Sequence, residues 1–245
     1  MFSIKNHPFG VAAFFKTSLV LTFAVPKDEL KTLIPECLEL DTFEDKWAFI
    51  AVALVDTKYL RPKGFPTFLG NDFILIGYRI FTKYINNKGK RLRGLYILKS
   101  ETNKKKMELL GNIFTHYKYT TTDIEFLKSN KSIIVKSIKS CLDIEVNLKE
   151  ENVNLPFNSP FKDWKEARRF AGPLPFTFTY NKNTKKVLII EGVRENWIPK
   201  AVEVIRNDCG FIKEKELNGI CLANAFVIED IPYYWKKGKT EIWKG

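Results

Sequence analysis

Residues 19–40 read LVLTFAVPKDELKTLIPECLEL and place an alternating segment directly before a helical segment that lies between two prolines. Over residues 19–25, large apolar side chains recur at every second position, which is the period of a half-buried strand. Pro26 then occupies what we expect to be the first position of a helix, and Pro35 ends it. The sequence therefore predicts a strand that leads at once into a short helix.

Most other ordered segments are typical of strands. Alternating or continuous apolar character predicts strands over residues 47–55, 73–84, 92–98, 132–138, 142–148, 176–180, 187–191 and 220–231. Helices are expected over residues 102–110, with Gly111 as the C-terminal cap, over residues 159–170, with Pro160 at the first helical position, and over residues 200–206. A long loop is expected over residues 56–70, which contain two prolines and two glycines. Since no repeat or linker divides the 245 residues, we expect a single β-rich α+β domain whose strands form a closed barrel or a sandwich.

The chain is strongly basic, with 40 lysines and arginines, 28 acidic residues and a formal net charge of +12. The excess is mostly lysine and is spread along the chain, which is typical of a solvated surface. The sequence lacks the interleaved basic and aromatic residues on which bases stack. We therefore expect nucleic acid to bind weakly and in a strongly salt-dependent manner. An acidic ligand is a second interpretation of the charge.

Few residues are suited to metal or cofactor chemistry. The four cysteines, Cys37, Cys141, Cys209 and Cys221, lie far apart, and the chain has only two histidines. We therefore expect free thiols in a reducing cytoplasm and no metal site. Glycine-rich nucleotide motifs and GxSxG are missing from the sequence, so we expect no cofactor. Lys16 interrupts the apolar run of residues 9–25, so we expect neither a signal peptide nor a membrane partner.

The order of short motifs in the opening segment carries a resemblance to a known family. Val-Pro, Leu, Ile-Pro and Leu-Glu follow the first strand in this order, and the arrangement resembles the start of the acetoacetate decarboxylase-like superfamily. The most similar branch is a large bacterial group, domain-of-unknown-function family 2071. The resemblance covers most of the chain. It implies an acetoacetate decarboxylase-like closed β-barrel with a few peripheral helices.

The decarboxylases of this superfamily use a Schiff-base lysine that follows an Arg-Glu strand and lies in a Pro-Lys-Lys motif. The matching segment here is residues 93–101, RGLYILKSE. In an ungapped match, Lys99 replaces the proline, Ser100 replaces the reactive lysine and Glu101 replaces its neighbour. Lys99 is the lysine next to the reactive position, so the resemblance makes it the candidate catalytic residue and implies that Ser100 and Glu101 lie beside the ligand.

The displacement by one residue has two physical consequences for Lys99. Successive side chains of a strand point to opposite faces, so Lys99 is expected to face away from the family's pocket. The carboxylate of Glu101 also favours the protonated amine, whereas a Schiff base requires the neutral one. We expect Lys99 to be an ordinary protonated amine and the protein not to be an efficient acetoacetate decarboxylase. A bulge that returns Lys99 to the pocket is the alternative.

Three further residues are candidates for ligand contact. Lys16 matches an arginine that the resemblance assigns to the substrate carboxylate, although an ammonium lacks the bidentate fork of a guanidinium. Arg61 belongs to the basic loop of residues 56–70. Trp197 lies in VRENWIP, where it could form a pocket wall or part of the core.

The interpretation that we prefer is a cytoplasmic barrel that binds a small, partly apolar ligand with a carboxylate or a carbonyl group. The first alternative is a decarboxylase-type lyase that uses Lys99 or a lysine of residues 104–106. The second is a non-catalytic basic module that binds nucleic acid or an acidic partner. The sequence leaves open whether the protein catalyses a reaction and whether it forms a homo-oligomer.

Overall fold

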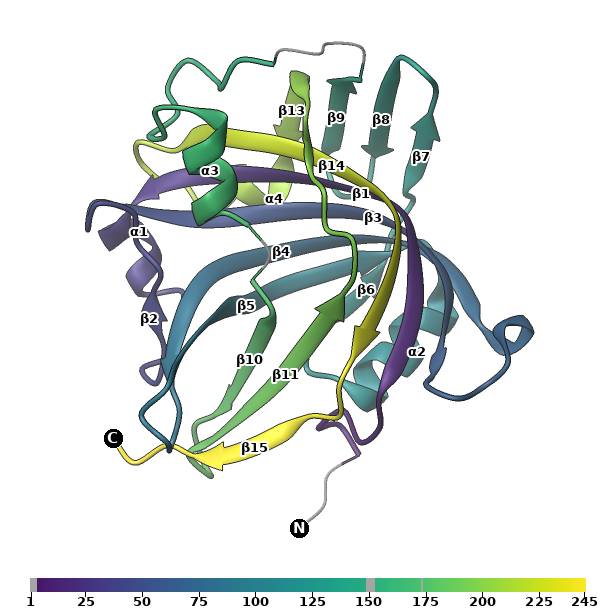
Figure 1. Ribbon diagram of the computed structural model, residues 1–245, viewed down its shortest axis with the longest axis vertical. Helices are drawn as coiled ribbons and strands as arrows, with labels where there is room; N and C mark the ends of the chain where they lie inside the picture. The colour runs from purple at the N-terminus through teal and green to yellow at the C-terminus, as the bar shows by residue number, and fades with distance from the viewer. Residues whose placement is uncertain (1–3, 149–152, 173) are drawn as a thin grey trace.

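The computed structural model describes residues 4–148, 153–172 and 174–245 and is rich in strands (Figure 1). The strands are β1 (Val11–Pro26), β2 (Glu39–Leu40), β3 (Trp47–Pro62), β4 (Asn71–Ile85), β5 (Arg91–Thr102), β6 (Tyr119–Thr121), β7 (Glu125–Lys128), β8 (Ser132–Ser137), β9 (Leu142–Asn147), β10 (Phe176–Asn181), β11 (Lys186–Arg194), β12 (Lys200–Ala201), β13 (Glu203–Cys209), β14 (Cys221–Trp235) and β15 (Lys239–Ile242). The helices are α1 (Lys27–Lys31), α2 (Lys105–Phe114), α3 (Trp164–Phe170) and α4 (Gly210–Lys213), with a 3-10 turn η1 (Thr67–Leu69). No helix in the described part of the chain is long and apolar enough to cross a membrane.

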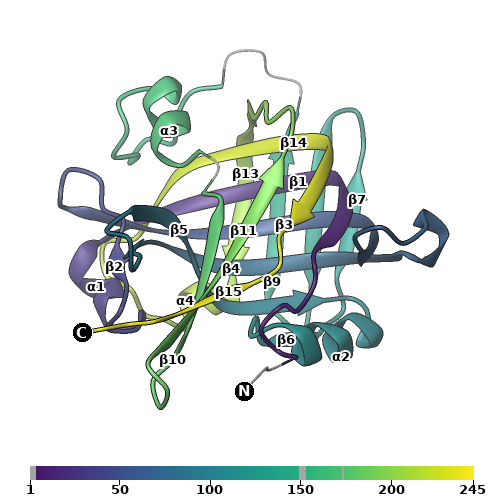
Figure 2. The same ribbon diagram turned by 60° about the horizontal axis from the view of Figure 1, so that its bottom comes forward.

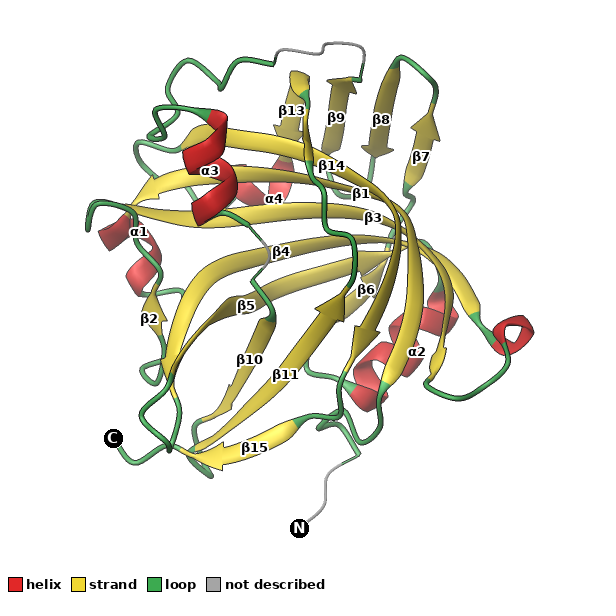
Figure 3. Cartoon of the chain, viewed as in Figure 1, coloured by secondary structure: helices red, strands yellow, loops and turns green. Residues whose placement is uncertain are grey.

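The larger sheet returns to its own starting strand. Its hydrogen-bonded order is β12-β14-β1-β3-β4-β5-β10-β11-β15, with β2 and β6 beside β4 and β5. Because β11 also pairs with β14, the strands β14, β1, β3, β4, β5, β10 and β11 follow one another around a ring, which we call the strand ring. Figure 3 shows these strands in yellow around one interior. The strand ring therefore has an inner and an outer face.

The outer face of the strand ring packs against a second sheet, β13-β9-β8-β7. Leu19 and Leu21 of β1 and Ile50 of β3 share a buried cluster with Ile133 and Val135 of β8. Residues two apart on a strand share a face, so the alternation over residues 19–25 aims these side chains at the second sheet. The main core thus lies between the two sheets.

The inner face is covered at two ends by helices. At one end Phe49 of β3 stacks on Phe161, which precedes α3, with ring centroids 5.4 Å apart. At the other end Met107 of α2 packs against Phe73 of β4 in a separate apolar cluster. Figures 1 and 2 show α3 and α2 on opposite sides of the ring. The interior between these two clusters carries the polar residues described below.

Most of the expected strands are present, and the expected β-rich α+β class with few helices is confirmed, but residues 200–206 do not form a helix. They form β12 and most of β13. Val204 pairs with Val146 of β9 and packs against the main core, and Val202 is buried. Burial of these β-branched side chains beside a sheet outweighs the weak helical spacing of the segment.

The expected loop over residues 56–70 is also too long. β3 continues to Pro62, which pairs with Val11 of β1, so only residues 63–70 connect β3 to β4. α2 runs through Gly111 to Phe114 instead of ending at this glycine. A Cβ at Gly111 would lie 2.4 Å from Cδ2 of Tyr119, so close packing explains this glycine better than a helix cap.

Two helix starts differ from those expected from proline. Pro26 is the N-cap of α1 and not its first residue, and α1 ends at Lys31, before Pro35. α3 begins at Trp164, where the carboxylate of Asp163 accepts a hydrogen bond from the backbone N–H of Glu166 at 2.7 Å. A capping aspartate therefore sets this start, several residues after the proline that the sequence suggested.

Candidate carboxylate-binding site

Arg79 is placed on the inner face of β4, in a strand that is otherwise mostly apolar. It lies opposite Ala51 of β3 and Ile97 of β5. Its guanidinium group packs over Gly77, where a Cβ would lie 2.8 Å from both Nε and Nη2. Alanine and glycine at these inward positions leave room for a guanidinium group inside the strand ring.

The guanidinium group of Arg79 has no anionic partner in the described part of the chain. No hydrogen bond or ion pair joins it to a described residue, and its Nε is buried without an acceptor. Burial lowers the pKa of Arg79, while Tyr233, Tyr119 and Tyr117 raise it. The side chain lies deep in the protein, and it is half-buried by surface area. A buried cation without a counter-charge is costly, and arginine is the side chain best suited to a carboxylate.

Arg194 of β11 is a second cation on this inner face. It pairs across the strands with Tyr233 of β14. Its guanidinium carbon lies 4.2 Å from the ring centroid of Trp197, and its buried Nη2 has no hydrogen-bond partner among the residues that the structure describes. Burial lowers the pKa of Arg194, Tyr233 raises it and the charge of Arg79 lowers it. The two guanidinium groups therefore affect each other, and the interior between them favours an anion.

Tyrosine hydroxyls surround the two arginines. The hydroxyl groups of Tyr117 and Thr177 share a hydrogen bond of 2.8 Å. Burial raises the pKa of Tyr119 to about 12, and it raises the pKa of Tyr117 as well. Both phenols are consequently neutral near pH 7, so their O–H groups can donate hydrogen bonds to an anion. The ring of Tyr233 stacks on Phe15 at 4.6 Å.

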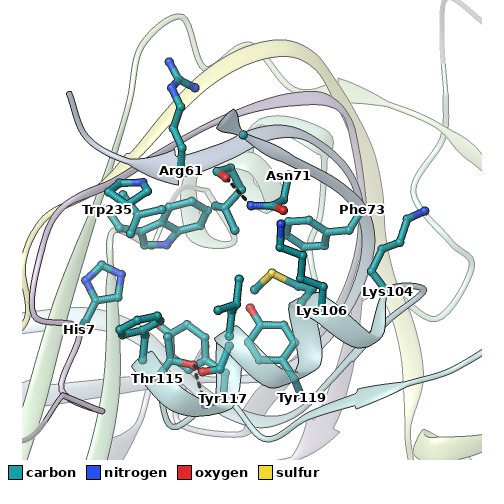
Figure 4. Close-up of a pocket in the computed structure, with 18 of the residues that line it drawn as sticks. His7, Arg61, Asn71, Phe73, Lys104, Lys106, Thr115, Tyr117, Tyr119 and Trp235 are labelled. Carbon is teal, nitrogen blue, oxygen red and sulfur yellow. Dashed lines mark hydrogen bonds between the residues drawn. The ribbon is translucent and has the colours of Figure 1, made fainter. Parts of the chain in front are cut away.

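A cavity of about 550 Å³ opens beneath α2, at the end of the strand ring that adjoins these tyrosines (Figure 4). Its walls come from the segment before β1, the end of β3, the start of β4, α2 and Trp235. Tyr117 and Tyr119 line it, and the hydroxyl of Tyr119 points into it. Arg79 and Arg194 do not line this cavity, but Tyr117 and Tyr119, which do, also act on the charge of Arg79.

The predicted site residues separate into two groups. Ser100 lies on the inner face opposite Gly77, next to Arg79, and Trp197 lies under Arg194. Arg61 lines the mouth of the cavity, where its guanidinium group donates 2.8 Å hydrogen bonds to backbone carbonyls of its own hairpin. These three candidates therefore lie at or beside the arginine cluster and its cavity.

Lys99 and Glu101 lie on the outer face of β5. Lys99 pairs with Tyr78, and its Nζ lies 2.7 Å from Oε1 of Glu101. Glu101 is buried and accepts hydrogen bonds from the hydroxyls of Tyr78 and Ser140 at 2.9 and 2.8 Å. A bulge is present in β5, between the pairs of Tyr78 and Arg79, but it leaves Ser100 and not Lys99 beside Gly77. Glu101 and Lys99 thus belong to a polar cluster between the two sheets.

Lys16 lies apart from both groups. It is exposed and forms an ion pair with Asp230 of the neighbouring strand at 2.7 Å. The sequence analysis missed the inward residues Arg79 and Arg194. The signal available for Arg79 was a single arginine, two residues after a glycine, in the apolar strand FILIGYRIF. No group of three histidine, cysteine or acidic residues suited to a metal ion occurs among the described residues.

The chain resembles one sequence family and several solved structures. Residues 14–234 match the family DUF2071, described as an uncharacterized conserved protein. No curated protein matches the chain in sequence. Acetoacetate decarboxylase from Legionella pneumophila superimposes with a TM-score of 0.61 and 9% identity, over 96% of this chain and 88% of that one.

Two further structures have the same fold. An acetoacetate decarboxylase-like enzyme from Sphingomonas wittichii RW1 matches with a TM-score of 0.58 and 9% identity, over 96% of this chain and 92% of that one. The enduracididine biosynthesis enzyme MppR, complexed with pyruvate, matches with a TM-score of 0.55 and 7% identity, over 95% of this chain and 90% of that one. The family resemblance drawn from the sequence is confirmed, and at these identities the structures show a shared fold.

Proposed function

We propose that this chain, which belongs to the family DUF2071, binds a small, partly apolar ligand through a carboxylate or carbonyl group. In this proposal the strand ring works as a closed barrel and the ligand lies on its inner face. The observation that carries the proposal is Arg79, whose guanidinium group lies deep in the protein, with a buried Nε, and forms no ion pair or hydrogen bond with any described residue. A carboxylate there would accept a charge-assisted, bidentate pair of hydrogen bonds.

The surroundings of Arg79 favour an anion over a neutral guest. Arg194 adds a second positive charge, and the phenols of Tyr117 and Tyr119 are neutral donors at ordinary pH. In the relative MppR, complexed with pyruvate, the bound molecule is itself a small carboxylate with a carbonyl group. An acid of this chemical class would neutralise the unpaired charge in the interior.

Ser100 and Lys99 bear on whether a Schiff base forms. Ser100 occupies the inner position that the family resemblance assigns to the reactive lysine, and its hydroxyl cannot form an imine. The amine of Lys99 is held by the buried carboxylate of Glu101 on the other face. The proposed function is therefore ligand binding, without covalent catalysis by Lys99.

A lysine-dependent lyase is the second candidate, and a different pair of lysines favours it. Lys104 and Lys106 both line the cavity beneath α2. An amine in contact with a bound ketone can form a Schiff base if it loses its proton. For either candidate we propose a cytoplasmic location, because the four cysteines are free thiols.

Calorimetric titration with hexanoate tests the proposed function. Hydrogen bonds to a charged group contribute about 1.5–3 kcal/mol, so Arg79→Met is expected to weaken hexanoate binding by roughly 10- to 150-fold. Arg91→Met is the matched control, because Arg91 is exposed at the far end of β5. Hexanol is the matched neutral ligand. Equal affinities of the wild type and Arg79→Met for hexanoate, or of the wild type for hexanoate and hexanol, would contradict the proposal.

A further inference from the structure

The cavity beneath α2 is larger and more apolar than a short acid requires. Its volume of about 550 Å³ lies in the range of sites that hold ligands of drug size. The side chains that dominate its walls are apolar and come from four segments of the chain, among them Phe9, Val11, Phe73, Leu110, Phe114 and Trp235. A molecule as small as acetate or pyruvate would leave most of this surface uncovered.

We propose that the ligand is an amphipathic carboxylic acid whose extended apolar tail, a medium-chain alkyl or an arylalkyl group, fills this cavity. Its carboxylate would then extend past Tyr119 toward Arg79. This inference deepens the proposed function and rests on it, because it uses Arg79 as the anion site. It adds the size and chemistry of the rest of the ligand.

Tyr119 connects the cavity with the arginine. Its hydroxyl points into the cavity in Figure 4, and it interacts electrostatically with Arg79. The amide side chain of Asn112 holds the backbone of Tyr119 against α2, through hydrogen bonds of 2.9 Å to its N–H and 2.8 Å to its carbonyl. Gly111 allows the ring to lie directly on α2. The helix that forms one wall of the cavity therefore also positions the residue at its inner end.

The cations at the mouth are less suited to hold the carboxylate. The guanidinium group of Arg61 already donates to two backbone carbonyls. Lys104 and Lys106 are exposed, so water screens their charges. The Nε of Arg79 is buried, and the guanidinium group has no counter-charge among the described residues. An acid with its carboxylate inside and its tail toward the mouth therefore gains more than one bound in the opposite direction.

A series of straight-chain acids tests this inference on the unmodified protein. Each methylene group that enters an apolar site increases affinity by roughly fourfold, so affinity should rise steeply from acetate through hexanoate and decanoate until the cavity is filled. The measurement is calorimetric titration, with tryptophan fluorescence as a second signal, because Trp235 lies in the cavity wall. Alcohols of equal length are the controls for the carboxylate.

A matched pair of variants on α2 tests the place of the tail. Leu110 lines the cavity, whereas its neighbour Leu109 is 63% exposed and is not among the lining residues. Leu110→Trp should fill part of the cavity and weaken decanoate binding at least tenfold, while the affinity for acetate changes less than twofold. Leu109→Trp should leave both affinities unchanged. The length series decides the question even if Leu110→Trp does not fold.

The outcomes separate this inference from the proposed function. If affinity does not increase with chain length, while short acids still bind and depend on Arg79, the tail inference is wrong and the proposed function stands. If no acid binds, or if alcohols bind as well as acids, both are wrong. If decanoate binds tightly but Arg79→Met does not weaken it, the carboxylate does not reach Arg79, and the inference is overturned.

Discussion

Replacement of Arg79 by methionine should stabilise the ligand-free protein although it abolishes the proposed anion site. Methionine keeps an unbranched apolar stem over Gly77 and removes a charge that has no partner in the described part of the chain. Replacement of buried ionic groups by apolar ones of similar size is often neutral or stabilising, by about 1–4 kcal/mol. Because Arg79 is only half-buried by surface area, we expect the lower part of this range, about 1–2 kcal/mol.

This gain can be measured by thermal and urea unfolding without ligand. For a domain of this size, about 1 kcal/mol corresponds to roughly 2–4 °C in Tm, so Tm should rise by about 2–8 °C. The unfolding free energy of the control Arg91→Met should lie within about 0.5 kcal/mol of the wild-type value, because Arg91 is exposed. With an acid at a hundred times its wild-type Kd, the wild type gains about 2.7 kcal/mol, whereas a variant that binds 10- to 150-fold more weakly gains only about 0.3–1.4 kcal/mol. The stability advantage of Arg79→Met should therefore shrink by about 1.3–2.4 kcal/mol when the acid is added. If Arg79→Met lowers the unfolding free energy by more than about 1 kcal/mol, Arg79 is a structural residue and the reasoning is refuted.

Four further predictions follow from the site and its surroundings. Gly77→Ala should displace the guanidinium group of Arg79, which a Cβ would approach to 2.8 Å, and should weaken hexanoate binding at least tenfold; unchanged binding would contradict the packing argument. Burial lowers the pKa of His7 below 6.5, so the unfolded chain binds a proton first and stability is lost as pH falls from about 6.5 through the folded-state pKa. Urea unfolding at several pH values should therefore show that the unfolding free energy of His7→Gln falls less steeply with decreasing pH than that of the wild type. An unchanged pH dependence of the unfolding free energy would exclude this role of His7. Borohydride reduction with acetoacetate should leave Lys99 unlabelled, because Glu101 holds its ammonium group; stoichiometric labelling at Lys99 in a peptide mass analysis would contradict this. Glu101→Leu should lower the unfolding free energy by about 3 kcal/mol, because it leaves buried donors without an acceptor, and a change below about 1 kcal/mol would argue against the polar cluster.

The sequence predicts the side chains on the outer face of the strand ring better than those on its inner face. Over residues 19–25 the alternation is clear, because one face packs against a second, apolar sheet. Residues 200–206 do not form the expected helix because residues 203–206 pair with β9, whose partner residues lie up to 56 positions away in the chain, as for Glu203 and Asn147. Local spacing contains no information about such a distant partner.

The candidate site was predicted in part, and its central residue was missed. The position of Lys99 on the outer face follows from its one-residue displacement in the sequence, because successive side chains of a strand point to opposite faces. The role of Arg79 does not, because a charged residue in a strand is usually exposed, and only the closed order of strands makes that face an interior. Tyr119 was missed for a related reason. Its place at the inner end of the cavity depends on Gly111 of α2, which the sequence suggested as a helix cap.

A crystal structure with 6-bromohexanoate would test the central claim most directly. The anomalous signal of bromine reports the position of the tail, and the electron density of the acid reports the position of the carboxylate. We predict bromine in the cavity beneath α2, and carboxylate oxygens at about 2.7–2.9 Å from the guanidinium nitrogens of Arg79. A carboxylate bound at Lys104 or Lys106, or an acid located elsewhere in the molecule, would contradict the account.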